Sequence, residues 1–260
     1  MRDIQGYSSD LTFSQWELIE GFLEQKPGKG RSRLTETRKV MNGILYILRT
    51  GCQWRYLPST YPRKSIVYYY FSKWRDDQTL DDVMQALRGS IRLHFGRTLE
   101  PRAAIIDSQT VKSTKMCRED TGYDAAKKIK GRKRHIAVDV LGLLICVMVK
   151  SDNIQDYKGA FELLSLAKKI CPTIQKFWAD SGYHVHALLD WVTETLKSTL
   201  EIIKRPRKTF KIVQWRWIGE RTFGWLNRCR RLSKDYETLA TSSEAWIKLS
   251  MSNIMIRRLA

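Results

Sequence analysis

The chain has 260 residues, with 46 lysines and arginines against 27 aspartates and glutamates, so its formal net charge is +19. Hydrophobic residues make up 43% and charged residues 28%, which are ordinary globular proportions and exclude a disordered polycation or a fibrous chain. The positive charge attracts polyanions, above all nucleic acid, and leaves ribosomal, regulatory and enzymatic functions open.

The cysteines and the apolar segments indicate the compartment. The five cysteines are widely spaced and form no CxxC pair, so we expect a reducing compartment and neither a disulfide framework nor a zinc site. The longest apolar run, residues 141–149, is about half of a membrane span and is typical of a buried strand. The first residues contain no signal-peptide hydrophobic region. We therefore expect a cytosolic protein.

The pattern of residues 12–95 predicts helices throughout. A first helix is expected from a Ser14 cap to about Gln25, and the linker 26–33 follows it. Further helices are expected over 35–50, ending at Gly51, then from a Ser65 cap to about residue 75, and over about 80–95. This part of the chain is predicted to form an N-terminal helical domain, residues 1–98.

The arrangement of these helices around Trp54 and Trp74 resembles a winged or helix-turn-helix DNA-binding module. However, the connection between the second and third helices is longer than the turn of about 3–4 residues in that motif. A helical cap that packs on the rest of the chain is therefore the alternative.

After Pro101 short β-rich runs alternate with helical ones, which predicts a mixed α/β domain over residues 99–260. Strands are expected at 103–106, 134–140, 143–149, 176–179 and 200–203, and helices at about 156–169 and 185–196. We expect the first three strands to be antiparallel neighbours, with Gly142 in the tight turn between the second and third.

Three acidic residues are candidates for catalysis. Asp107 and Asp180 each follow a predicted strand and precede a serine, and open α/β sheets bind ligands at strand ends. A strand followed by a helix cap is the simpler explanation of either site alone. Glu220 lies in a helix predicted over residues 214–234 and shares one face with Arg216. Three carboxylates in a strongly basic protein indicate magnesium or manganese, which prefer hard oxygen ligands.

The predicted helix 214–234 has two distinct faces. One face carries Arg216, Glu220, Phe223, Asn227, Arg230 and Lys234, and an apolar stripe elsewhere carries Trp215, Ile218, Trp225 and Cys229. Burial of the stripe would present one acid among bases. Trp217 and Trp225 are candidates for stacking on unpaired bases, with packing in the core as the alternative for Trp225.

Basic residues next to the acids are candidate DNA contacts. Six lysines and arginines fall within residues 127–135, and a solvated charged face is the alternative for such a run. The residues selected as DNA-binding are Lys130, Arg132, Lys133, Arg134, His135, Arg216, Arg221, Arg228, Arg231 and Lys234. His135 is expected to touch DNA or to fill the edge of the sheet.

Several other polar residues are expected to have different roles. Asp139 is a possible fourth ligand, but the alternation of its strand favours a surface acid or one that supports the ligands. Asp156 is expected to cap a helix. A metal site at His184 and His186 is disfavoured, because no third ligand stands at a supporting spacing. Glu237 is the rival of Glu220.

Five separated blocks, in order, resemble the insertion-sequence transposases of the DDE type. They are IIDSQTVKST, GYDAAKKIKGRKRHIAVDVLGLL, SDNIQDYKGA, FWADSGYH and WIGERTFGWLNRCRRLSKDYE, and the N-terminal LRTGCQWRYLPSTYPRKSIVYYYFSKW resembles the accessory region of the same bacterial family. The resemblance implies a ribonuclease H-like mixed sheet flanked by helices, preceded by a small helical DNA-binding-like domain.

The resemblance also implies a function. Asp107, Asp180 and Glu220 match the three acids, which would hold two Mg²⁺ or Mn²⁺ ions for cleavage of DNA at element ends and strand transfer into target DNA. Arg216 fits the family's signature around the glutamate, but Val213 and Asn227 replace its tyrosine and lysine. A homodimer on double-stranded DNA, in the bacterial cytoplasm at the nucleoid, is expected. The alternatives are a metal-dependent nuclease without strand transfer and a non-catalytic DNA-binding regulator.

Overall fold

The computed structural model describes residues 6–23, 35–114, 117, 121–124, 128–204 and 214–260. The predicted linker 26–33 and Val213 lie outside these residues. The N-terminal part is helical: α1 (Phe13–Glu17), α2 (Glu20–Leu23), α3 (Thr37–Thr50), the 3-10 turn η1 (Trp54–Tyr56), α4 (Lys64–Asp76) and α5 (Thr79–His94). No helix in the described ranges combines the length and apolar character that crossing a membrane requires.

The predicted N-terminal helices are confirmed in kind, but both predicted caps are wrong. Arg63, not Ser65, occupies the cap position of α4. Thr12, not Ser14, caps the first helix, in a reciprocal capping box with Gln15, and α1 and α2 are two short helices where one was predicted. The expected end of α3 is confirmed, because Gly51 takes the left-handed conformation with φ of 71°.

The remaining chain forms a mixed α/β unit, as predicted. Its strands are β1 (Ala103–Lys112), β2 (Gly122–Asp124), β3 (Ile129–Asp139), β4 (Leu144–Ser151), β5 (Lys176–Asp180) and β6 (Thr199–Ile203). Its helical elements are α6 (Asp156–Ile170), η2 (Ser181–Tyr183), α7 (His186–Glu194), α8 (Gln214–Leu226), η3 (Arg230–Leu232) and α9 (Ala240–Leu259). The helix predicted over 214–234 therefore ends at Leu226, and neither β2 nor α9 was predicted individually.

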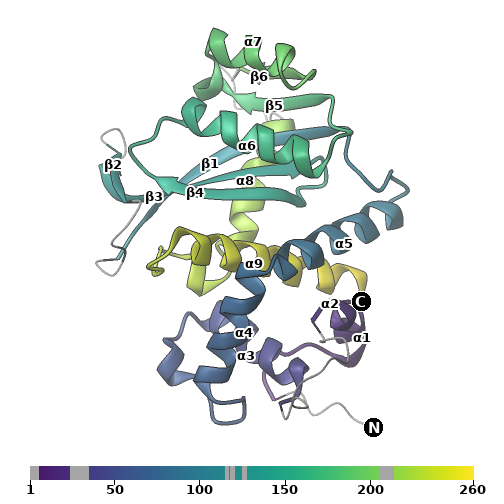
Figure 1. Cartoon of the computed structure of the whole chain (residues 1–260), viewed down its shortest axis with the longest axis vertical. Coiled ribbons are helices and arrows are strands. Elements are labelled where there is room, and N and C mark those ends of the chain that lie inside the picture. The colour runs from purple at the N-terminus through teal and green to yellow at the C-terminus, as the bar shows by residue number, and fades with distance from the viewer. Residues whose placement is uncertain (1–5, 24–34, 115–116, 118–120, 125–127, 205–213) are drawn as a thin grey trace.

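One sheet with the order β2-β3-β1-β5-β6 organises this unit, and β4 also pairs with β3. β1, β3 and β4 are antiparallel neighbours, as predicted, whereas β5 and β6 run parallel to β1. In Figure 1, α6 and α7 lie on one side of the sheet, and α8, α9 and α5 lie on the other. Alternate residues of β1 feed two separate cores, with Ala104 and Ile106 facing α6 and Ile105 facing the opposite side.

The core behind the sheet continues into the N-terminal helices. Its buried side chains come from α3, α4 and α5 as well as from the sheet, α8 and α9. Within it, Phe71 of α4 stacks on Trp246 of α9 at a ring-centroid distance of 4.5 Å. The boundary between residues 98 and 99 stays a prediction, but the helices on both of its sides share α9 as a packing partner.

Candidate active site

The parallel pairing of β1 with β5 places two of the predicted acids side by side. Ile105 is the partner of Trp178, and Asp107 and Asp180 each follow two residues later. Side chains two residues apart in a strand share a face, so both carboxylates lie on the face of the sheet that Ile105 presents to α8. Asp180 ends β5 as predicted, whereas Asp107 lies inside β1, which continues to Lys112.

Glu220 reaches the same place from α8. The helix packs on β1 and β5, and the indole of Trp215 stacks on that of Trp178 with centroids 4.2 Å apart and planes 7° apart. Arg216, one turn before Glu220, places its Nε 3.0 Å from Glu220 Oε1 and its Nη1 3.6 Å from Asp180 Oδ2. The structure thus brings Asp107, Asp180, Glu220 and Arg216 together from three elements.

The pKa of Asp107 reflects the closeness of the other two acids and of Arg216. Burial, together with the charges of Asp180 and Glu220, raises the pKa of Asp107 to about 7, against the opposing effects of the Ser108 N–H donor and Arg216. Asp107 Oδ1 accepts from the Ser108 N–H at 2.8 Å, and Asp180 Oδ1 accepts from the Gly182 N–H at 2.9 Å. The three acids therefore repel one another, and a cation between them would relieve that repulsion.

Divalent metal suits the chemistry of this donor set. Three carboxylates supply hard oxygen atoms, and two of them are balanced by the guanidinium of Arg216. Within the described residues, no three acidic, histidine or cysteine side chains already stand close enough together to hold one ion. Metal entry would therefore require these side chains to rearrange, with Arg216 released from at least one acid.

Gly219 is a functional position that the sequence reasoning missed. A Cβ atom added there would lie 2.6 Å from Asp107 Oδ2 and 2.9 Å from Asp107 Cβ. Only a glycine lets α8 approach β1 this closely, next to Glu220. An isolated glycine inside a helical pattern is the signal that could have found it.

The other candidate acids have different partners. Asp139 is fully buried and pairs with Arg92 at 2.6 Å, while the N–H groups of Leu141 and Leu143 donate to its Oδ1. The prediction of a surface or ligand-supporting role for Asp139 was therefore wrong. Glu237 pairs with Arg231, and its carboxylate is not among the charges that act on Asp107.

Asp156 has a role other than the predicted cap. Gln155 occupies the cap position of α6, and Asp156 is the first helical residue. Its Oδ1 accepts from the Ser108 hydroxyl at 2.9 Å and pairs with Lys133 Nζ at 3.0 Å. Asp156 therefore lies beside Asp107 at the border of the site, where Ser108 of β1 and Lys133 of β3 hold its carboxylate.

Most of the predicted basic contacts on β3 are buried inside the protein. Arg132, Lys133, Arg134 and His135 are covered, because β3 has neighbouring strands on both edges and helices on both faces. Direct contact of these four side chains with DNA is therefore a wrong prediction for this structure. Lys130, at the start of the strand, is exposed.

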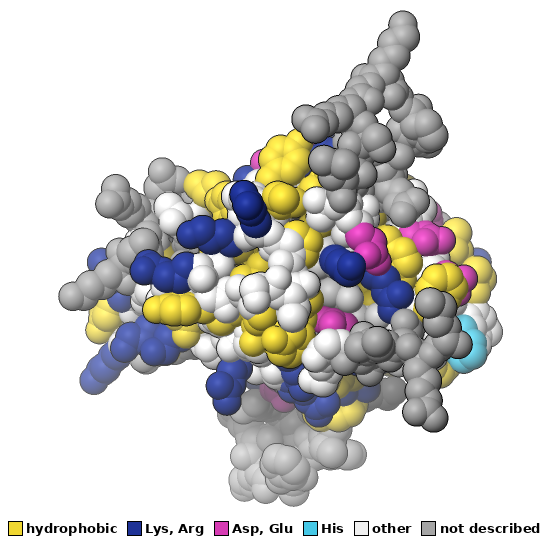
Figure 2. All heavy atoms as spheres, turned by 90° about the horizontal axis from the view of Figure 1, so that it is seen from below, with side chains coloured by type: hydrophobic (Ala, Val, Ile, Leu, Met, Phe, Trp, Pro, Cys, Tyr) yellow, Lys and Arg dark blue, Asp and Glu magenta, His cyan; other side chains and the backbone are white. Residues whose placement is uncertain are grey.

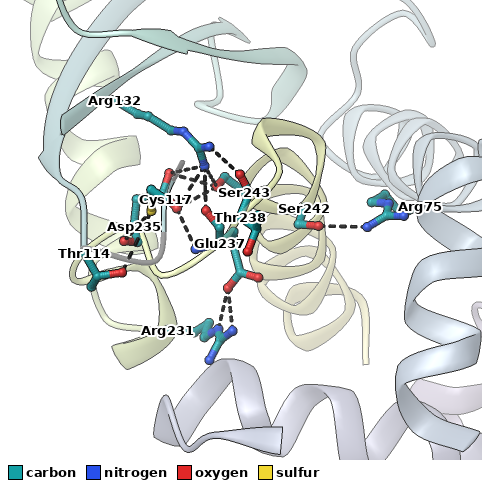
Figure 3. Close-up of polar contacts among 10 residues, drawn as sticks. All are labelled: Arg75, Thr114, Cys117, Arg132, Arg231, Asp235, Glu237, Thr238, Ser242 and Ser243. Carbon is teal, nitrogen blue, oxygen red and sulfur yellow. Dashed lines mark hydrogen bonds and ion pairs between the residues drawn. The ribbon is translucent and has the colours of Figure 1, made fainter. Parts of the chain in front are cut away.

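These buried cations instead join the sheet to the C-terminal segment. Arg132 donates to the carbonyls of Glu237 at 2.9 Å and Thr238 at 2.7 Å and lies 3.5 Å from Asp235 (Figure 3). Asp235 also accepts from the Ser243 hydroxyl, and Arg134 donates to the Leu232 carbonyl at 2.9 Å. Figure 3 shows Glu237 turned towards Arg231, a buried candidate for which direct DNA contact is likewise a wrong prediction.

The remaining candidates stay accessible to different degrees. Arg228 and Lys234 are exposed, and Arg216 and Arg221 are partly buried. Arg221 donates to the Leu141 carbonyl and stacks over the rings of both Trp217 and Trp225. His184 and His186, both exposed, have ring centroids 5.8 Å apart.

The buried His135 makes stability depend on pH. Burial lowers the pKa of His135 to about 4, so the folded protein keeps the ring neutral where the unfolded chain, with a pKa near 6.5, binds a proton. Stability is therefore complete above pH 6.5 and falls as the pH drops towards 4. Between pH 7 and pH 5 we expect wild type to lose about 2 kcal/mol more unfolding free energy than His135→Gln. Urea titrations at both pH values measure this, and equal losses would refute it.

Two family models and one curated relative match the chain. A model described as "Transposase DDE domain" matches residues 98–254, and one described as "Putative transposase of IS4/5 family" matches residues 11–84. The "Putative transposase for insertion sequence element IS402" of Burkholderia cepacia is 29% identical over 163 residues, which are 57% of this chain and 72% of that protein. All three acids brought together at the sheet fall within the first match.

Proposed function

The chain belongs to the transposases with a DDE catalytic domain, and on that premise we propose that Asp107, Asp180 and Glu220 are its catalytic acids. Membership implies a ribonuclease H-like fold, DNA as substrate and dependence on divalent metal, generally Mg²⁺. The observation that carries the assignment is the approach of these three carboxylates from β1, β5 and α8 to one place, where they act electrostatically on one another.

The proposed cofactor is a pair of Mg²⁺ or Mn²⁺ ions held by the three acids. When bound, two such ions activate the attacking oxygen and stabilise the leaving oxygen of an in-line displacement at phosphorus. The chain's contribution is to hold the carboxylates in place: β1 fixes Asp107, the Gly182 N–H orients Asp180, and the Trp215–Trp178 stack seats the helix that carries Glu220.

The proposed reaction has two displacements at one centre. Water first attacks the phosphodiester at the element end, and the broken P–O bond leaves a 3′-hydroxyl. That hydroxyl then attacks a phosphodiester of the target DNA, which joins element and target and releases a second 3′-hydroxyl. Arg216 pairs with two of the acids and would exchange one of them for a DNA phosphate.

The exposed basic residues complete the proposed DNA surface. Lys130, Arg228 and Lys234 are open to solvent, and Arg216 and Arg221 are partly so. These five remain from the ten predicted contacts after the buried ones are removed. Two ends must be joined in one event, so we propose a homodimer on DNA, acting at the bacterial nucleoid.

A direct assay tests the proposal. Purified protein with Mg²⁺ and duplex DNA from the regions flanking its gene is expected to yield both cleaved ends and joined products, and EDTA is expected to suppress both. Cleavage without joining would favour a nuclease of the same fold. Binding without either product, in the presence of Mg²⁺ or Mn²⁺, would favour a DNA-binding regulator. Gel electrophoresis of end-labelled duplexes separates these outcomes.

A further inference from the structure

A basic cavity lies where the N-terminal segment meets α3, α8 and α9. Its volume is about 430 Å³. Its lining includes Arg49, Trp225, Arg228, Asn253, Arg257 and Arg258, and the other lining residues are uncharged. Four of these residues are arginines and none is acidic. We call this cavity the arginine pocket.

Three of the four guanidinium groups in the arginine pocket have contacts inside the protein that hold them, those of Arg49, Arg257 and Arg258. Arg257 donates to Asn253 Oδ1 and to the Ser8 carbonyl, both at 3.2 Å, and Arg49 donates to the Arg228 carbonyl at 3.3 Å. Arg258 lies over the ring of Trp225, 4.3 Å from its centroid. Within the described ranges, no carboxylate forms an ion pair with any of the four.

Among the described residues, the pocket therefore concentrates positive charge that no carboxylate in its lining balances, which favours an external anion. Burial and the nearby charge of Arg221 lower the pKa of Arg258, and the more weakly acting charge of Asp139 opposes that shift. Each guanidinium has five N–H donors in a planar fork that matches phosphate oxygens, and the bonds inside the protein use only some of them. The underside of the molecule in Figure 2 also shows many lysines and arginines and few acids.

The position of the pocket relates it to the acidic centre. The part of α8 from Glu220 to Leu226 is about 9 Å long at 1.5 Å per residue, and Arg228 follows the end of the helix. Successive phosphates of one DNA strand are about 3.4 Å apart along the duplex axis. A duplex that lay along α8 with its reacting phosphate at the acids would bring phosphates about three positions away to the pocket.

We propose that the arginine pocket binds backbone phosphates of duplex DNA beside the reacting bond. The inference deepens the proposed function and rests on it. It adds a second, anion-binding site to the acidic one, built by the N-terminal segment and α3 together with the end of α8 and α9. A duplex held there contacts the helix that carries Glu220, so binding at the pocket would fix the position of the DNA along α8.

Salt dependence of DNA binding tests the pocket without knowledge of the element ends. The probe is a fluorescein-labelled 30-base-pair duplex, titrated with full-length protein at several NaCl concentrations in EDTA. Each phosphate contact contributes about 0.9 to the slope of log K against log[salt]. Arg228→Gln/Arg258→Gln is expected to bind at least tenfold more weakly at low salt, with a slope smaller by about 2, and Arg228→Lys/Arg258→Lys is expected to recover most of both.

The matched control is Lys169→Gln/Lys197→Gln, which also removes two exposed charges, from α6 and from the turn before β6. If Arg228→Gln/Arg258→Gln and Lys169→Gln/Lys197→Gln bound the duplex equally, with the same salt slope, the proposal that the pocket binds DNA would be overturned. Wild-type protein that fails to bind the duplex would instead overturn the proposed function. Inorganic phosphate could also raise the melting temperature of wild type but not that of Arg228→Gln/Arg258→Gln. If duplex binding were the same in both proteins, this result would assign the pocket to a small anion and also overturn the proposal.

Discussion

Asp107→Asn and Asp180→Asn are each expected to lower the rates of DNA cleavage and joining by roughly a thousandfold, while duplex binding persists. The reason is that an amide removes a negative oxygen ligand, and metal stabilisation of the transition-state charge amounts to several kcal/mol, about 4 kcal/mol being a thousandfold in rate. Both residues lie in the stretch that matches the DDE domain. Single-turnover assays on end-labelled duplexes measure the loss, and anisotropy measures binding.

Folding is not expected to suffer in these variants. Asp107 is a partly buried carboxyl whose pKa is raised to about 7 by burial and by its acidic neighbours, so a neutral side chain of the same shape removes repulsion from the folded protein. Asp190→Asn, at an exposed position of α7, is the matched control and is expected to stay active. Full activity in either Asp107→Asn or Asp180→Asn would remove that residue from the site.

Gly219→Ala is expected to lower both the cleavage rate and the stability of the protein. Gly224→Ala, on the same helix, is expected to lower neither. The new methyl at 219 would lie 2.6 Å from Asp107 Oδ2 and 2.9 Å from Asp107 Cβ, and the second contact cannot be relieved by turning the carboxylate alone. Either Asp107 or α8 must move. Overpacking of this kind costs about 1–3 kcal/mol of stability, and misplacement of a catalytic group by about 1 Å lowers rates roughly a hundredfold.

The control isolates the contact from the change in helix propensity. A Cβ at Gly224 has no heavy atom within 4 Å, so alanine there is expected to raise stability by about 0.5–1 kcal/mol. Urea unfolding and single-turnover cleavage of the two variants provide the comparison. If both alanines behave alike, the close approach of α8 to Asp107 is not what positions the acids.

The acids and the basic contacts were predictable to different extents. Asp180 was expected at a strand end and lies there, and the helix that carries Glu220 was expected from its periodicity. Both predictions use local patterns, which reveal the type of element directly. Arg132 and Arg134 were expected on a DNA-binding surface, yet the N–H donors of each bind carbonyl oxygens inside the protein. A run of lysines and arginines is usually solvated, and nothing local distinguishes a central strand from an edge strand.

Tertiary packing also decided the length of β1 and the limits of α8. The apolar run 103–106 predicted a four-residue strand, but β1 continues to Lys112 because β3 pairs with it along its whole polar half. The helix predicted over 214–234 ends at Leu226, and residues after it turn through η3 so that Asp235 reaches Arg132. Partners far away in the chain determine both outcomes.

By itself, the sequence determined the kind of partner and the alternation of elements, because net charge and short-range periodicity are properties of the chain alone, and it supplied the three candidate acids. The tertiary structure decided which cations face solvent, how α8 approaches Asp107 through Gly219, and that four arginines from three separate segments gather with Trp225 in one cavity. These features depend on contacts between elements that are far apart in the sequence, and the exposure of a charge is known only once both edges and both faces of its strand have been filled.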